Sequence, residues 1–316
     1  MKNMITAAMV LLLAQIVLTV AFNMDNKGIG TGTPDTPLLS FSPDAVQSLE
    51  FTNGEGKSLV LKKDKDGWVV PEHFSAPVDP NKIKELFDKL AELKQGFVVA
   101  TSAEAAKRFK VDTEVFENHV VLRDAEKPLV DFYVGTSPAF RQIHARRGDS
   151  SEIVTIPLSG FDLEAAVDKW LDTSLATLKD EDIVGLTFDA FKLKKAENGW
   201  QLEGMREDEK INREEVDAVV TKARGVVVQD VLDPTKFSDL IARPAFRFTV
   251  VRKDGRQVEY HFAKGEDDFY VLKMSDRDLY FKVHTLSVEA LQKATREKLV
   301  VNAAPAEKQT DSAAKQ

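Results

Sequence analysis

Two stretches of this 316-residue chain carry the same local pattern, and this repetition constrains the fold more than any other feature. Residues 63–70 read KDKDGWVV and residues 195–202 read KAENGWQL, so a Gly-Trp pair follows a charged turn in both places. Trp68 and Trp200 are 132 positions apart. Asp79 and Asn212, the predicted N-cap residues of the helices that follow, are 133 positions apart. An offset that holds across a hairpin and a helix indicates that one structural unit occurs twice. Both tryptophans then begin a strand after a tight turn, and we expect their rings to be core.

The segments around each tryptophan alternate apolar and polar side chains, which is typical of half-buried strands. After these strands, each half contains a predicted amphipathic helix, over 77–96 and over 211–225. Pro80 suits the first position of the first helix, and Asn212 with Glu215 has the spacing of a capping box in the second. Gly96 and Gly225 are expected to end the two helices.

Further alternating segments and a closing helix follow in each half. The first half is predicted to have strands at 46–52, 58–63, 68–70, 119–124, 129–135, 142–147 and 152–157, with a closing helix at 162–172. The second is predicted to have strands at 183–188, 191–196, 245–253, 257–265, 268–274 and 279–284, with a closing helix at 287–298. The predicted fold class is therefore α+β: two tandem, duplicated units, 45–178 and 179–301, each an antiparallel-rich sheet with packed helices.

The N-terminus contains an uncharged apolar run, MITAAMVLLLAQIVLTVAF, at residues 4–22. As a helix it would span roughly 28 Å, close to the ~30 Å of a bilayer's hydrocarbon core. We interpret residues 1–22 as a transmembrane signal anchor with a cytoplasmic N-terminus, because Lys2 precedes the run. A cleaved signal peptide is the alternative. Residues 23–44 are predicted to be a flexible tether and residues 302–316 a disordered tail. Both interpretations predict a body in the periplasm, and the anchor predicts single-pass attachment to the inner membrane.

The composition excludes several kinds of chemistry. With a net charge of −8 the chain lacks the concentrated basic surface that nucleic acid requires. Without cysteine it has no disulfide, thiolate metal site or cysteine nucleophile. The five histidines lie in separate segments without metal-ligand spacing, and no serine-nucleophile motif is present. We therefore expect neither an enzyme nor a bound cofactor or metal.

One basic cluster, FRQIHARRGD at 140–149, is distinctive in an acidic chain. Arg141, His144, Arg146 and Arg147 form a candidate docking patch for an acidic partner or a lipid headgroup, and a solvated hairpin is the alternative. On a strand, Arg141 and Arg147 would lie on one face, with His144 and Arg146 on the other.

Several landmarks resemble a bacterial family known only as a domain of unknown function, DUF4340. Gly67-Trp68 and the helix start at 77–80 resemble that family's pattern. Phe109-Lys110-Val111-Asp112 stands where the family has Tyr-Gly-Leu-Asp, and residues 143–146 stand where it has a Tyr-Val-Arg type of strand. The resemblance covers about residues 45–175 well and the second half weakly. Lys110 replaces the family's glycine, and the local turn is therefore expected to differ there.

The resemblance implies a membrane-anchored accessory protein that accompanies the permease and ATPase subunits of ABC transporters of the gliding-motility type. The function expected is a non-catalytic extracytoplasmic scaffold subunit of such a transport or cell-envelope complex. The alternative is a periplasmic module that binds a small ligand or glycan in a cleft between the two units. Phe140, Tyr270 and Tyr280 are candidate lining residues for that cleft, and they are equally candidates for the core.

Overall fold

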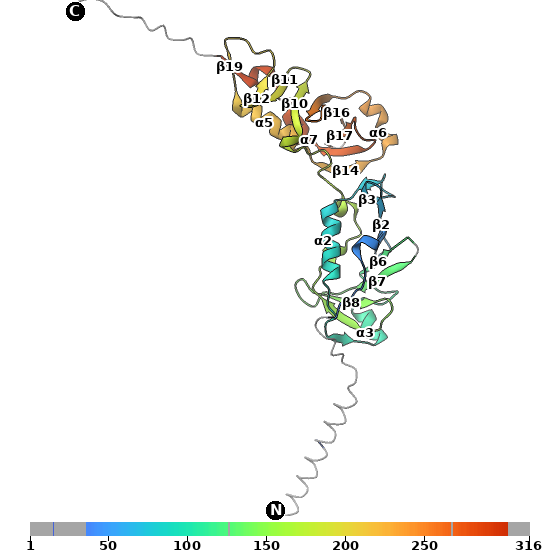
Figure 1. Cartoon of the computed structure of the whole chain (residues 1–316). Helices are drawn as coiled ribbons and strands as arrows, with labels where there is room; N and C mark the ends of the chain where they lie inside the picture. Colours follow the sequence, from blue (N-terminus) through green and yellow to red (C-terminus); the bar gives the residue numbers. More distant parts are fainter. Residues whose placement is uncertain (1–14, 16–35, 126, 267, 303–316) are drawn as a thin grey trace, which may run out of the picture. The chain divides into compact units, whose positions relative to one another are not determined.

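The computed structural model describes Gln15 and residues 36–125, 127–266 and 268–302. The chain divides into two compact units (Figure 1). One consists of the residues up to Pro71 together with Pro80–Trp170, and the other of Glu72–Asp79 together with the residues from Leu171 onward. The division at Trp170 falls earlier than the predicted boundary at 178, and a short segment of the first half belongs to the second unit.

The first sheet has nine strands in the order β4-β3-β2-β1-β6-β7-β8-β9-β5. Every pairing for which a register is resolved is antiparallel. The strands are β1 Ser48–Asn53, β2 Ser58–Asp64, β3 Gly67–Val70, β4 Ala76–Pro77, β5 Val98–Ala100, β6 Asn118–Arg123, β7 Pro128–Val134, β8 Ile143–Arg147 and β9 Ile153–Ile156.

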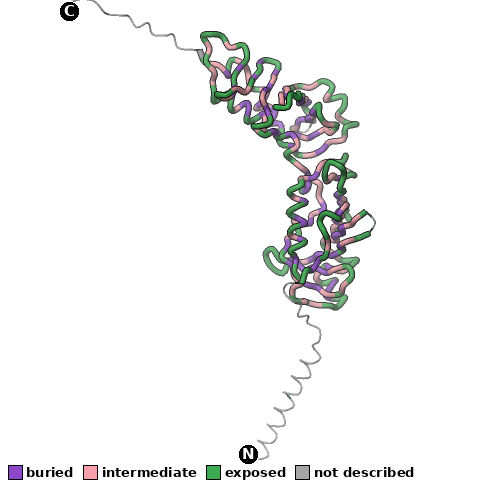
Figure 2. The backbone as a smooth tube through the Cα atoms, in the orientation of Figure 1, coloured by how far each residue is buried: buried purple, intermediate pink, exposed green. Residues whose placement is uncertain are grey.

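Helix α2, Pro80–Ala91, packs its apolar face on the first unit (Figures 1 and 2). Ile83, Leu86, Phe87 and Leu90 are buried, as their spacing predicts. The helix begins at Pro80 as predicted but ends before Gly96. The first unit also contains α3, Ala103–Arg108, and α4, Val167–Trp170, with 3-10 turns η1, Pro43–Ala45, and η2, Gly160–Leu163.

The second unit is built around an eight-stranded sheet in the order β12-β11-β10-β15-β16-β17-β18-β14. Its strands are β10 Ile183–Phe188, β11 Lys192–Ala196, β12 Gly199–Leu202, β14 Val228–Leu232, β15 Phe246–Arg252, β16 Gln257–Lys264, β17 Phe269–Met274 and β18 Tyr280–His284. A separate two-stranded sheet pairs β13, Glu209–Ile211, with β19, Val300–Asn302. The resolved pairings are again antiparallel.

Helix α5, Arg213–Arg224, has the ends that the sequence predicts. The Asn212 side chain accepts a hydrogen bond from the backbone N–H of Glu215, and the backbone N–H of Gly225 donates to the Thr221 carbonyl. The remaining helical elements of the second unit are α6 Pro234–Ile241, α7 Thr285–Gln292, η3 Asp180–Asp182 and η4 Arg296–Leu299. Trp200 is buried as expected, whereas Trp68 is half-buried with its ring edge-on to Phe87 at 5.8 Å.

The described residues thus form an α+β protein with antiparallel sheets, as predicted for the class. Further predicted boundaries also differ from the structure. The predicted tether extends to 44, yet Leu38 and Leu39 are buried in the first unit. The predicted helix at 162–172 is a 3-10 turn followed by the single turn α4.

No helix within the described part has the length and apolar character that a membrane crossing needs. The apolar run 4–22 lies outside that part except for Gln15. The predicted tail also lies outside it except for Asn302, which ends β19.

Candidate docking surface

Two of the four predicted docking residues, His144 and Arg146, are buried in the first unit. The Arg146 side chain donates from Nε to the Val111 carbonyl at 2.6 Å and from Nη1 to the carbonyls of Arg147 and Ser150 at 3.1 and 3.0 Å. Its guanidinium lies over the Tyr133 ring, 4.8 Å from the centroid. Arg146 therefore satisfies backbone acceptors inside the protein and is not available to a partner.

His144 has a similar structural role. Its ring stacks on Phe109 with centroids 4.2 Å apart, and Nδ1 lies 3.0 Å from the Thr136 hydroxyl and 2.9 Å from the Thr136 carbonyl. The sequence correctly places His144 and Arg146 on one face of β8. Burial of that face corrects the prediction that all four basic side chains form one docking patch.

The other two basic residues differ in their freedom to bind. Arg147 donates to both carboxylate oxygens of Asp149, at 2.8 and 2.6 Å, so its charge is already paired and its pKa is raised by those hydrogen bonds. Arg141 forms no ion pair in the described residues, and its guanidinium lies 5.4 Å from the Phe140 ring centroid. Of the four, Arg141 is the one that keeps an exposed cation for an external group.

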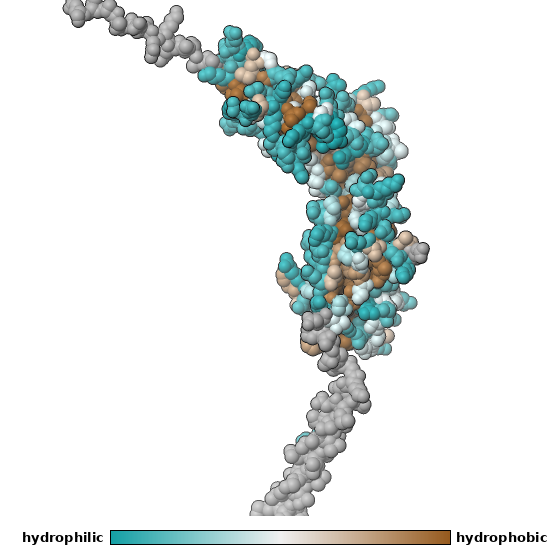
Figure 3. Space-filling model, viewed as in Figure 1, coloured by the Kyte–Doolittle hydropathy of each residue, from teal (hydrophilic) through white to brown (hydrophobic). Residues whose placement is uncertain are grey.

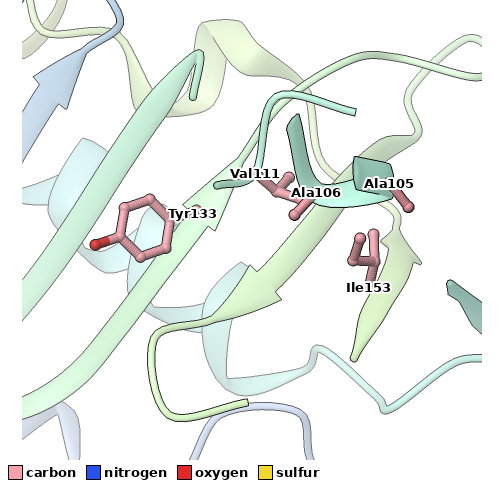
Figure 4. Packing of buried hydrophobic residues seen from close by; sticks show 5 residues of the cluster. All are labelled: Ala105, Ala106, Val111, Tyr133 and Ile153. Carbon is pink, nitrogen blue, oxygen red and sulfur yellow. The ribbon is translucent and has the colours of Figure 1, made fainter. Parts of the chain in front are cut away.

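The motif Phe109-Lys110-Val111-Asp112 holds together a small core rather than a site. Val111 packs in a buried cluster with Ala105, Ala106, Tyr133 and Ile153, which Figure 4 shows around α3 and the neighbouring strands. Lys110 has φ 54°, in the left-handed region that glycine adopts without strain. The turn therefore has the conformation that the family's glycine favours, although a lysine occupies it.

A groove of about 1020 Å³ lies beside Arg141 on the first unit. It is bounded by the segment that precedes β8 and by the segment that follows β9. Phe140 and Phe161 line it, and these residues are 88% and 80% exposed. Large apolar side chains so exposed are informative when they flank one hollow, because such patches mark binding surfaces. Sequence reasoning missed Phe161 altogether and treated Phe140 as a lining or core residue.

Local hydrogen bonds explain why both phenylalanines point outward. The Ser137 hydroxyl is within hydrogen-bonding distance of the carbonyls of Ala139 and Gln142, at 2.8 and 2.7 Å, and Arg141 has φ 53°, so a tight turn presents Phe140. Phe161 lies in η2, where Ser159 and Asp162 form a capping box. Fixed turns reduce the conformational entropy that a partner must remove on binding.

The floor of the groove is electrically balanced. Lys89 of α2 lies 2.8 Å from Glu85 and 2.9 Å from Asp162, and these hydrogen bonds raise the pKa of Lys89. The other two lining carboxylates, Glu117 and Glu164, lie 3.2 and 3.4 Å from lysines outside the lining. A partner that enters the groove therefore meets carboxylates that are already paired with lysines, together with the Arg141 guanidinium and the exposed rings of Phe140 and Phe161.

Three of the four histidines outside β8 are each next to one carboxylate, and the fourth, His284, caps α7 by accepting from the backbone N–H of Leu286 at 3.2 Å. His73 is 2.7 Å from Asp230, His119 is 2.8 Å from Asp131 and His261 is 2.7 Å from Glu259. Across residues 36–302, apart from 126 and 267, no group of three or more His, Cys, Asp or Glu side chains is placed to hold a metal ion. Tyr270, one of the aromatic residues considered for ligand binding, is buried.

These features describe an antiparallel α+β protein whose first unit carries a groove suited to binding another molecule. A family model described as "Domain of unknown function (DUF4340)" matches residues 68–244, more than half of the chain, and the chain belongs to this family. The match begins at Trp68 and continues past α6, so it includes much of the second unit, which the sequence resemblance covered only weakly. Comparisons with curated proteins and with solved structures give no match.

Proposed function

We propose that this protein is a non-catalytic, extracytoplasmic accessory subunit of an ABC-type transport or cell-envelope complex of the gliding-motility kind. The apolar run 4–22 would anchor it as a single-pass protein of the inner membrane, with both units in the periplasm. Its partners would be the permease and ATPase subunits of that complex. The assignment to ABC transport rests on the resemblance that the sequence carries.

The observation that carries the binding role is the pair of exposed phenylalanines at the groove. Burying an exposed phenylalanine side chain is favourable by about 1.5–3 kcal/mol. A partner that covered both rings beside the groove would therefore gain binding free energy from each. Figure 3 shows brown, hydrophobic residues among mostly teal ones on the visible face. Arg141 beside Phe140 adds a cation that has no ion-pair partner among the residues that the structure describes, and interface hot spots are enriched in aromatic residues and arginine.

We also propose that the two units arose by tandem duplication. From β3 to β5 the first sheet has the order 3-2-1-6-7-8-9-5, and the second has 12-11-10-15-16-17-18-14. We match β1–β3 and β5–β9, in chain order, to β10–β12 and β14–β18. Each strand then occupies the same position in its sheet as its match. Helices α2 and α5 precede the two edge strands, and α3 and α6 follow them. The common offset of the Gly-Trp pairs supports the same proposal.

The experiment is affinity purification of the tagged intact chain from gently solubilised membranes, with its companions identified by mass spectrometry. We expect an ABC permease and its ATPase to accompany the wild-type chain. A Phe140→Ser/Phe161→Ser variant should recover at least tenfold less of them, because the loss of a hot-spot aromatic costs about 2 kcal/mol or more. Leu286→Ser is the matched control, since Leu286 is 68% exposed on the second unit. Recovery of the chain alone, or equal recovery with the double variant, would contradict the proposal.

The alternative expected from the sequence is small-ligand or glycan binding in a cleft between the two units, and the observation that favours ligand binding is instead the size of the groove on the first unit. Its volume of about 1020 Å³ is just above the roughly 300–1000 Å³ that small-molecule sites occupy. A thermal-shift screen against envelope glycans and metabolites tests it, because a ligand of the folded state raises the melting temperature. A positive ligand should lose its effect in the Phe140→Ser/Phe161→Ser variant.

A further inference from the structure

The chain enters the first unit at a fixed point beside the segment that leads into β5. The backbone N–H of Gln95 donates to the Thr36 carbonyl at 2.8 Å, and that of Leu38 donates to the Leu93 carbonyl at 2.8 Å. Pro37 bridges antiparallel to Lys94, and Leu38 is buried. Whatever precedes Thr36 is therefore attached to the body next to Gln95.

The edge strand that follows this entry point is unusually apolar on its outside. Phe97, which directly precedes β5, is 82% exposed, and Val99 within the strand is 47% exposed. Residues 96–102 read GFVVATS, seven uncharged residues in a chain in which 30% are charged. β5 is protected as an edge strand by its three-residue length and by the irregular register at Val99, but not by charged side chains. The feature that calls for a neighbouring surface is therefore the exposed apolar side chains of Phe97 and Val99.

The length of chain before Thr36 limits what that cover can be. Thirteen residues, 23–35, separate the predicted membrane span from Thr36. Thirteen residues reach about 45 Å when fully extended and roughly 20 Å as a flexible linker. The entry point and the adjacent edge are thus kept close to the bilayer surface, where the local concentration of lipid is high.

The strand registers place the groove at the same end of the sheet. Val98 pairs with Val154 of β9, and Ile156 of β9 pairs with Ile143 of β8, both antiparallel. Phe97 therefore lies at the end where β9 finishes and β8 starts, and the two groove-forming segments extend from that end. A bilayer against Phe97 would bring the groove close to proteins embedded in the same membrane.

We propose that the β5 edge, through Phe97 and Val99, rests in the outer surface of the bilayer that the predicted anchor spans. This proposal rests on the proposed function and deepens it, because it assigns the lipid surface as a second partner and gives the first unit an orientation. Phenylalanine is among the apolar side chains that proteins lying on a membrane surface insert at the boundary between headgroups and acyl chains. The contact needs no specific lipid headgroup, because it is apolar.

The test uses the absence of native cysteine, which makes single-cysteine labelling unambiguous. The full-length variants Phe97→Cys, Val99→Cys and Leu286→Cys are labelled with the environment-sensitive fluorophore NBD and reconstituted into nanodiscs of phosphatidylethanolamine and phosphatidylglycerol. When doxyl-labelled lipid replaces part of the bilayer, the labels at 97 and 99 should lose most of their emission. The label at 286, an exposed apolar position of the second unit, should keep its emission.

A second variant separates lipid contact from mere proximity. In the Val99→Cys protein, an added Phe97→Asp change should restore most of the emission, whereas Phe97→Leu should leave the quenching unchanged. If the protein enters nanodiscs but doxyl-labelled lipid quenches the labels at 97 and 99 no more than the label at 286, the lipid contact is overturned and the accessory role is left intact. Protein that does not enter nanodiscs, scored separately by size-exclusion chromatography, overturns the anchor and with it both proposals.

Discussion

Gly135 is the position at which the smallest substitution should cause the largest loss of stability in the first unit. It directly follows β7, and its N–H donates to the His144 carbonyl at 3.0 Å. A Cβ added there would lie 2.0 Å from the Phe109 carbonyl oxygen and 2.3 Å from that of Lys110. Both contacts are with backbone atoms, which cannot rotate away as a side chain can. Gly135→Ala must therefore displace the turn at Phe109–Lys110.

The magnitude follows from what that displacement breaks. The Phe109 carbonyl accepts from the Thr136 N–H at 2.9 Å, and the neighbouring Val111 carbonyl accepts from Arg146. Overpacking costs about 1–3 kcal/mol, and each lost hydrogen bond adds about 1 kcal/mol. We expect Gly135→Ala to lower the free energy of unfolding by roughly 3–5 kcal/mol. In a unit of this size that corresponds to a decrease in Tm of roughly 10–20 °C.

Differential scanning calorimetry of the full chain measures this, because the second unit provides an internal reference. The matched control is Gly160→Ala, also at the groove, where an added Cβ meets nothing within 4 Å. We expect the control to stay within about 0.5 kcal/mol of the wild type. If both variants melted at the same temperature, the close packing of Gly135 against the Phe109–Lys110 backbone would be refuted.

Two further predictions concern buried and paired charges. Glu209 accepts two hydrogen bonds from Arg296, at 2.9 and 2.8 Å, which lower its pKa from 4.5 to about 2. Because the folded-state pKa of Glu209 is depressed, the stabilisation from this pair is present above pH 4.5 and is lost as the pH falls toward 2. The urea midpoints of wild type and Glu209→Gln should therefore converge over that range. A difference between the two midpoints that stayed constant with pH would contradict the role of the Arg296 pair. Arg146→Lys should lower the free energy of unfolding by about 2–4 kcal/mol, because an ammonium cannot reproduce the three directed hydrogen bonds of the guanidinium. The control, Arg147→Lys, should change it by under about 1 kcal/mol. Equal urea midpoints for the two variants would show that Arg146 is not structural.

Elements with a local signal were predictable from the sequence. The start of α5 followed from Asn212 and its end from Gly225, and most strands followed from alternation. The edge strands β5 and β14 were missed because they are defined by pairing with β9 and β18, across irregular registers, and β5 has only three residues. The closing helix of the first unit was overpredicted because Ser159 and Asp162 fix a 3-10 turn instead.

The candidate site was less accessible to sequence reasoning. Alternation correctly separated Arg146 from Arg147, but it could not show that the turn at residues 109–111 covers the Arg146 face. Phe140 and Phe161 resemble core residues in composition, and only the turns around them make them exposed. The available signals were small or polar neighbours: Ser137 and Pro138 before one, and Gly160 and Asp162 around the other.

The most direct test of the account is the location of the folded units. A Glu197→Cys variant places a single thiol on an exposed turn of the second unit. In intact spheroplasts we expect a membrane-impermeant maleimide to label it, and we expect carbonate washing to leave the labelled chain in the membrane pellet. Labelling only after lysis would place the units in the cytoplasm and contradict the account, and release of the labelled chain by carbonate would contradict the anchor.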